Sequence, residues 1–214
     1  MEQIDKIASA QFTKLVGLPE LTQLTSLEFS ESSSVPNFDS STQLKRLKVV
    51  HWSRRHFDYS NVTHLHNLEI FDVCSWEKSG HVDLSVISQL TKLQKIQVQD
   101  RRTFSGLTAL SNLTSLEILD VPLNQELCNE IGQLTNLREL AIPHEGDAEL
   151  QPLTALQKLT FLHSSIRYGQ PELRWYTALT QIRVLAPACN IATERLVVWS
   201  QSLPHLVALL NKHN

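Results

Sequence analysis

The sequence predicts an α/β solenoid, a curved right-handed coil with a parallel sheet on its concave side and irregular arcs on its convex side. The first observation is a phrase of two apolar residues three apart and a third two further on, as in Leu137, Leu140 and Ile142. The second is that this phrase occurs eight times, with first positions 20, 21, 28, 20, 24, 19 and 23 residues apart. A period of that size is typical of a solenoid. The third is that one copy alone cannot bury its leucines, whereas stacked copies form a continuous core.

Each phrase predicts a turn followed by a strand. An apolar-x-apolar step places two side chains on one face of a strand, so Leu140 and Ile142 face inward while Ala141 and Pro143 face outward. A spacing of three does not fit an extended strand with both leucines inside, so a turn leads the chain into each strand. The eight copies are Leu24, Leu27, Phe29; Leu44, Leu47, Val49; Leu65, Leu68, Ile70; Leu93, Ile96, Val98; Leu113, Leu116, Ile118; Leu137, Leu140, Ile142; Leu156, Leu159, Phe161; and Leu179, Ile182, Val184.

Two copies resemble the leucine-rich repeat family, LSNLTSLEILDVPLN at 110–124 and IGQLTNLRELAI at 131–142. They look like the short repeats of roughly 22 residues found in internalin-like and cytoplasmic regulatory proteins. The resemblance covers roughly residues 18–187 and implies a module that binds other proteins.

One departure from the family concerns an asparagine that usually stands three residues after the last apolar residue of the strand. None of the corresponding positions here is Asn, so we expect an irregular solenoid whose turns find other hydrogen-bond partners. The register near Trp52 and Val73 is the least secure. The eight positions hold Ser32, Trp52, Val73, Arg101, Val121, Glu145, Ser164 and Pro187.

The two ends differ from the repeats, as the terminal parts of a solenoid must. We expect an N-terminal cap at 1–17, about eight leucine-rich repeats at 18–190, and a capping helix at 191–214. The helix is indicated by helical spacing of apolar residues. A degenerate ninth repeat around Leu206 and Leu209 is the alternative. The helically spaced residues are Leu203, Leu206, Val207 and Leu210.

Composition narrows the class of protein. A net charge of −3 argues against general nucleic-acid binding, although Arg54 and Arg55 among aromatic residues keep that alternative open. The first residues do not form a signal peptide, and no apolar run is long enough to cross a membrane. The three cysteines, Cys74, Cys128 and Cys189, are odd in number and far apart, which favours a reducing compartment and hence the cytoplasm.

The sequence contains no arrangement of residues that indicates catalysis. It has no nucleophile elbow, P-loop or H-E-x-x-H motif. His64 and His66 flank Leu65 on an expected exposed turn, and no further ligands follow at metal-binding spacing. We therefore predict a protein that is not an enzyme and that has no cofactor or metal site.

The predicted binding site is an apolar stripe on the concave face. The residue after each final strand apolar residue is expected to point outward, and six of these eight are apolar. Exposed apolar patches usually mark interaction sites, whereas a register slip of one residue would exchange inside and outside. The eight positions are Ser30, Val50, Phe71, Gln99, Leu119, Pro143, Leu162 and Leu185. The predicted partner-binding residues are Val50, Phe71, Leu119, Leu162 and Leu185, with Asp72, Asp100 and Asp120 beside them to select a basic partner.

These observations predict a non-enzymatic module that binds a protein partner on its concave face. The alternative is the recognition region of a larger sensor or effector protein. We expect no nucleic-acid or membrane partner, and self-association through the apolar stripe stays open.

Overall fold

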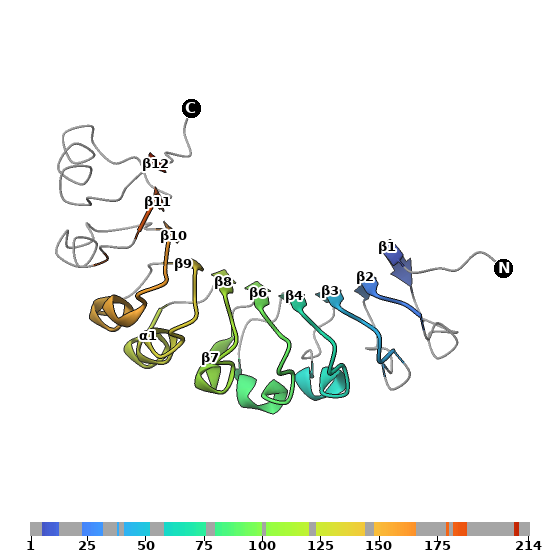
Figure 1. Cartoon of the computed structure of the whole chain (residues 1–214). Helices are drawn as coiled ribbons and strands as arrows, with labels where there is room; N and C mark the ends of the chain where they lie inside the picture. Colours follow the sequence, from blue (N-terminus) through green and yellow to red (C-terminus); the bar gives the residue numbers. More distant parts are fainter. Residues whose placement is uncertain are drawn as a thin grey trace.

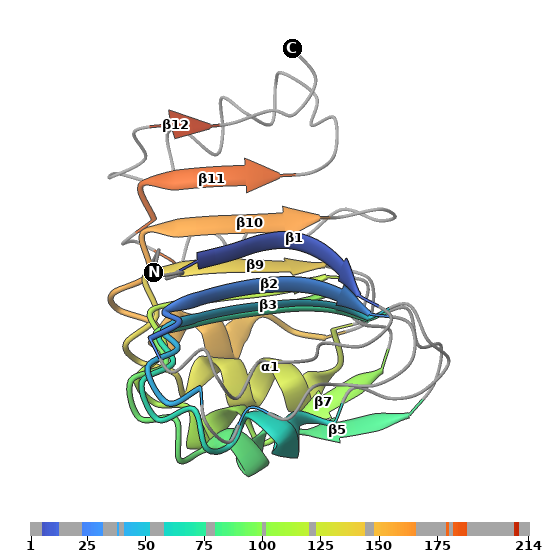
Figure 2. The ribbon, with the colours of Figure 1, turned by 90° about the vertical axis from the view of Figure 1, so that its right-hand side faces the viewer.

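The computed structural model describes residues 6–12, 23–31, 38, 41–51, 58–75, 80–99, 102–119, 123–143, 148–165, 179, 182–187 and 208–209. Within these ranges ten parallel strands form one sheet along the inner side of an arc, and the helical segments lie on the outer side (Figure 1). The strands of the sheet run alongside one another (Figure 2). They are β1 (Lys6–Phe12), β2 (Ser26–Glu31), β3 (Arg46–His51), β4 (Ile70–Ser75), β6 (Lys95–Gln99), β8 (Ser115–Leu119), β9 (Glu139–Pro143), β10 (Phe161–Ser165), β11 (Val184–Pro187) and β12 (Ala208–Leu209). The predicted α/β solenoid is confirmed.

Each coil buries a ladder of apolar residues that begins before the strand. In the coil of β8, Leu110, Leu113 and Leu116 stand three apart, Ile118 follows, and all four are buried. The ladder therefore has one more three-residue step than the predicted phrase. In β6 the burial alternates as the phrase requires, with Ile96 and Val98 inside.

The strand pairing fixes the register of the eight predicted copies. It places one residue from each of these copies in a single row, with intervals of 20, 24, 25, 20, 24, 22 and 23 residues. These residues are Leu27, Leu47, Phe71, Ile96, Leu116, Leu140, Leu162 and Leu185. The predicted phrase has the correct register in five copies and is wrong by three residues in the third, seventh and eighth.

The outer arcs are short helical segments, and side chains cap the first turns of η2, η3 and α1. Asp58 and Asp83 each accept a hydrogen bond at 2.9 Å from the backbone N–H of the serine two residues on. Asn124 accepts one from Leu127 at 2.7 Å. A two-stranded sheet of β5 (His81–Asp83) and β7 (Thr103–Ser105) lies among these arcs. The helical segments are η2 (Tyr59–Val62), η3 (Leu84–Ile87), η4 (Leu107–Ala109), η5 (Gln151–Ala155) and α1 (Gln125–Gly132).

Asparagines join neighbouring coils at a position that the sequence analysis did not consider. The amide groups of Asn67, Asn112 and Asn136 donate to carbonyl oxygens of the preceding coil at 2.8, 2.6 and 3.0 Å. The acceptors are Thr42, Thr91 and Ser111. Each asparagine directly precedes a buried ladder leucine, so these amides bridge coils before the strand instead of after it.

Strand pairing continues toward both ends. β1 pairs with β2, and β12 pairs with β11, so strands occur inside both terminal segments of the predicted division. Residues 1–5, 13–22, 188–207 and 210–214 lie outside the described residues, and the division into caps and repeats stays a prediction. Among the described residues, every helix is too short or too polar to cross a membrane.

Candidate functional site

The concave face presents rows of half-buried side chains that run across the strands. The middle row alternates with the two core rows and contains mostly polar residues, which suits a surface that faces solvent on one side. Neighbouring strands are close enough for side chains in one row to touch. The described members of this row are Glu28, Lys48, Asp72, Gln97, Glu117, Ala141 and His163.

Two of the predicted partner-binding residues lie in the core, so the prediction that they face outward is wrong. Phe71 is 0% exposed and pairs in register with Leu47, and Leu162 is 1% exposed and pairs with Leu140. A shift of three residues, like any odd shift, reverses the faces of a strand. Leu185 pairs with Leu162, so its assignment to the outward row came from the same register error of three residues.

The remaining predicted residues have different outcomes. Val50 is half-buried and lines a hollow on the concave face. Leu119 pairs with Gln99, as the predicted register requires. Asp72 lies in the middle row, while Asp100 and Asp120 lie outside the described residues. In the corrected register Val50 on β3 pairs with Cys74 on β4, and Cys74 pairs with Gln99 on β6. Polar side chains therefore interrupt the predicted apolar stripe.

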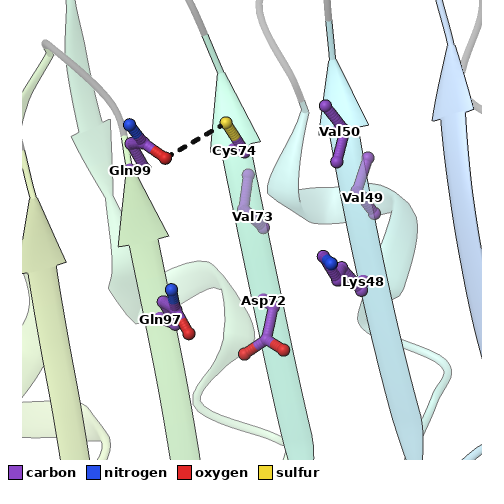
Figure 3. A pocket seen from close by; sticks show the side chains of 8 residues that line it. All are labelled: Lys48, Val49, Val50, Asp72, Val73, Cys74, Gln97 and Gln99. Atoms are coloured by element: carbon purple, nitrogen blue, oxygen red, sulfur yellow. Dashed lines mark hydrogen bonds between the residues drawn. The ribbon is translucent and has the colours of Figure 1, made fainter.

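The hollow, which has a volume of about 340 Å³, lies over strands β3, β4 and β6. Two rows of side chains cross it (Figure 3). Asp72 lies between Lys48 and Gln97, and Cys74 lies between Val50 and Gln99. In the first of these rows the short Asp72 on the central strand is flanked by the longer Lys48 and Gln97, and the buried residues Val49 and Val73 lie beneath.

Asp72 carries the main electrostatic feature of the hollow. Its Oδ1 atom is buried and has no hydrogen-bond partner among the described residues. Burial raises the pKa of Asp72, while Lys95, Lys48 and Arg46 act in the opposite direction. A carboxylate oxygen in this situation gains from any hydrogen-bond donor that is brought to it.

The cation next to Asp72 in the row already has a partner. The Lys48 ammonium donates to the Glu28 carboxylate at 2.7 Å, and this hydrogen bond raises the pKa of Lys48. In the adjacent row the Cys74 thiol donates to Oε1 of Gln99 at 3.5 Å. Sequence reasoning did not select Lys48, Cys74, Gln97 or Gln99; once the register is known, the short Asp72 between the longer Lys48 and Gln97 is a signal for the hollow.

The residues that line the hollow do not include His64, His66 or Arg102. His64 and His66 are exposed and flank the buried Leu65, as predicted. Arg102 is 3% exposed and its guanidinium lies 5.9 Å from the centre of the Tyr59 ring, so it is unavailable to nucleic acid. Arg54, Arg55 and Arg101 lie outside the described residues.

Metal-binding and thiol chemistry also find no support in the described part of the chain. Among the described residues, no three His, Cys, Asp or Glu side chains gather in a way that could hold a metal ion. Burial raises the pKa of the Cys128 thiol to about 11, which keeps it protonated and unreactive at neutral pH.

Comparison with known proteins identifies the fold. No protein-family model matches the sequence, and no curated protein does. Among solved structures, internalin C2 of Listeria monocytogenes is similar with a TM-score of 0.59 and 18% identity, over 96% of this chain and 81% of that one. A leucine-rich repeat protein of Leptospira interrogans has a TM-score of 0.55 and 18% identity, over 90% of this chain and 50% of its own.

A third similar structure is the Toll–Spatzle complex of Drosophila, with a TM-score of 0.63 and 13% identity, over 88% of this chain and 28% of the matched one. These proteins share a solenoid built from leucine-rich repeats. The likeness confirms the predicted resemblance at the level of the fold.

Proposed function

We propose that this leucine-rich repeat solenoid is a non-enzymatic interaction module that binds a protein partner on its concave face. The observation that carries the proposal is the hollow over β3, β4 and β6, which is lined by the Asp72 carboxylate, one oxygen of which has no hydrogen-bond partner among the described residues. Binding sites are typically concave and combine apolar walls with a few polar groups, and this hollow has both. The Toll–Spatzle complex gives a precedent for protein binding by a similar solenoid.

A cytoplasmic location is part of the proposal. The buried Cys128 forms no disulfide. A cysteine outside a disulfide favours a reducing compartment. The proposed partner is therefore another protein of the same compartment, or a second copy of the chain.

A peptide selection tests the concave face without knowledge of the natural partner. Peptides from a phage-displayed random library are selected on the immobilised chain, and their affinities are then measured for two variants. Gln97→Arg places a bulky cation on the concave face, whereas Gln89→Arg makes the same substitution at an exposed turn outside the sheet of the same coil.

We expect Gln97→Arg to weaken the selected peptides by about tenfold or more, because it fills the hollow and adds a charge that the peptides were not selected to meet. Gln89→Arg is expected to leave their affinity unchanged. Equal affinities for the parent chain and both variants would show that the peptides bind elsewhere, and the proposed function would then lose its surface. A selection that enriches no peptide would count against the proposal in the same way.

A further inference from the structure

The charges around the hollow restrict what can occupy it. Arg46, Lys48 and Lys95 are the cations that act on Asp72, while Glu28 is the neighbouring anion. A cationic side chain from a partner would approach three like charges. An acidic side chain would meet the Asp72 carboxylate itself. An uncharged hydrogen-bond donor avoids both penalties.

The hydrogen-bonding groups then favour one uncharged side chain. Ionised Asp72 can only accept, and its Oδ1 has no partner within the described part of the chain. Gln97 stands next to Asp72 in the row, on β6, and its amide group can donate as well as accept. A carboxamide carries one donor group and one acceptor, so it can pair with both residues at once.

The neighbouring row supplies the apolar part of the site. Val50 and Cys74 line the hollow beside Asp72 and Gln97. They offer a surface for the methylene groups of a side chain whose polar end reaches the carboxylate. The volume of about 340 Å³ is enough for a single side chain of this kind and is small for a folded element.

We propose, on the premise that the concave face is the binding surface, that the hollow receives a glutamine or asparagine side chain of a protein partner, whose amide N–H donates to the carboxylate of Asp72. Gln97 donates to the carbonyl oxygen of the same carboxamide. Asp72 is then the residue that selects the partner, through a hydrogen bond to its carboxylate instead of through attraction to a basic segment.

The test uses peptides selected from the random library on the parent chain, restricted to those that Gln97→Arg weakens. We expect them to share a Gln or Asn at one position. Replacing this residue by Ala should lower affinity for the parent about tenfold or more, because the hydrogen bond has a charged acceptor. On the Asp72→Ala variant the same replacement should have little further effect. Glu117→Ala, an acidic residue of the same row two strands away, is the matched control and should behave as the parent.

Substitution in the peptide gives a second reading that needs no protein variant. Gln→Met keeps the length and removes the donor, and Gln→Lys adds a charge; both should weaken binding to the parent. A shared Lys, Arg, Asp or Glu in place of the carboxamide would overturn the inference, as would an affinity loss that is equal on parent and Asp72→Ala. Those results leave the concave-face function standing, whereas peptides insensitive to Gln97→Arg count against that function itself.

Discussion

The convex arcs and the concave sheet of this solenoid both contain Asp, Gln and Ser, but these residues have different surroundings. On the convex side Asp83 accepts from the N–H of Ser85, and Glu130 accepts from the N–H of Leu107 at 2.7 Å. The ring nitrogens of His81 lie 2.9 Å from Thr103 Oγ1 and 2.8 Å from Ser105 Oγ, which joins β5 to β7. On the concave side Asp72 keeps a buried oxygen without a partner among the described residues.

The difference separates residues that build the coil from residues that the coil only displays. Arc carboxylates and amides satisfy backbone groups that helix ends leave open, so the fold depends on them. The outward side chains of the sheet are free of this task, because the strands satisfy one another's backbone groups through the ladder. Substitutions should therefore destabilise the core and the convex arcs, and should spare stability on the concave face.

The largest effect on stability should come from a substitution that tests the register of β4. Phe71→Ala removes a fully buried ring and is expected to lower the free energy of unfolding by about 3–5 kcal/mol. Ile70→Ala, one residue earlier on the outward side, should cost less than about 1 kcal/mol. Urea unfolding followed by circular dichroism measures both. Similar losses for the two variants would mean that β4 does not have the register described here.

A convex cap should give the next largest effect. Asn124→Ala removes the acceptor for the N–H of Leu127 at the start of α1 and should cost about 1 kcal/mol. Asn129→Ala, an exposed position inside the same helix, should change stability by no more than about 0.5 kcal/mol, because alanine favours the helix. If both asparagines prove equally dispensable, the arcs do not depend on their caps.

On the concave face the expected effect has the opposite sign. Asp72→Asn should raise the melting temperature at pH 7, because it removes a carboxylate whose charged form burial disfavours. The folded-state pKa of Asp72 is raised above its ordinary value of 3.8, so its favourable contribution is complete below that pH and is lost as pH rises through the folded-state value. Differential scanning fluorimetry should show the advantage of the variant shrinking as pH falls toward 3.8. A gap that widens on acidification would contradict the role given to Asp72.

The sequence predicts the solenoid but only part of the register. After Leu140 the large apolar residue that completes the phrase stands two positions on, at Ile142, and no Leu, Ile, Val or Phe stands three positions on. The register of that copy is therefore unambiguous. After Leu68 both Ile70 and Phe71 are apolar, and a phrase with one three-residue step accepts the wrong one. The longer ladder of Leu65, Leu68, Phe71 and Val73, all of them buried, resolves the choice.

The candidate site was harder to predict, since it depends on residues from three coils. Asp72 on β4 is shorter than its neighbours Lys48 on β3 and Gln97 on β6, and a wrong register for β4 hides that relation. The hydrogen bonds of Asn67, Asn112 and Asn136 were also hard to predict, because they join different coils. The N-L pairs are visible in the sequence, whereas the carbonyl groups that they reach belong to another coil.

The smallest effect should come from the ion pair between Lys48 and Glu28 on the concave face. The pair is short at 2.7 Å, but its side chains are 45% and 36% exposed, so solvent weakens the attraction. A double-mutant cycle with Lys48→Met and Glu28→Gln should give a coupling of about 0.2–1 kcal/mol that falls with added salt. The longer and more exposed pair of Lys45 and Glu69, at 3.6 Å, provides the control and should couple less.

The pH dependence of this coupling has a definite sign. The folded-state pKa of Lys48 is raised above its ordinary value of 10.5, chiefly by the hydrogen bond to Glu28, so the stabilisation is complete below 10.5 and is lost as pH rises through the folded-state value. The cycle measured at pH 7 and pH 9 should therefore give the same coupling. A coupling above that of a buried pair, or one unaffected by salt, would mean that the concave row holds the sheet together as the convex caps hold the arcs, and the contrast between the two faces would fail.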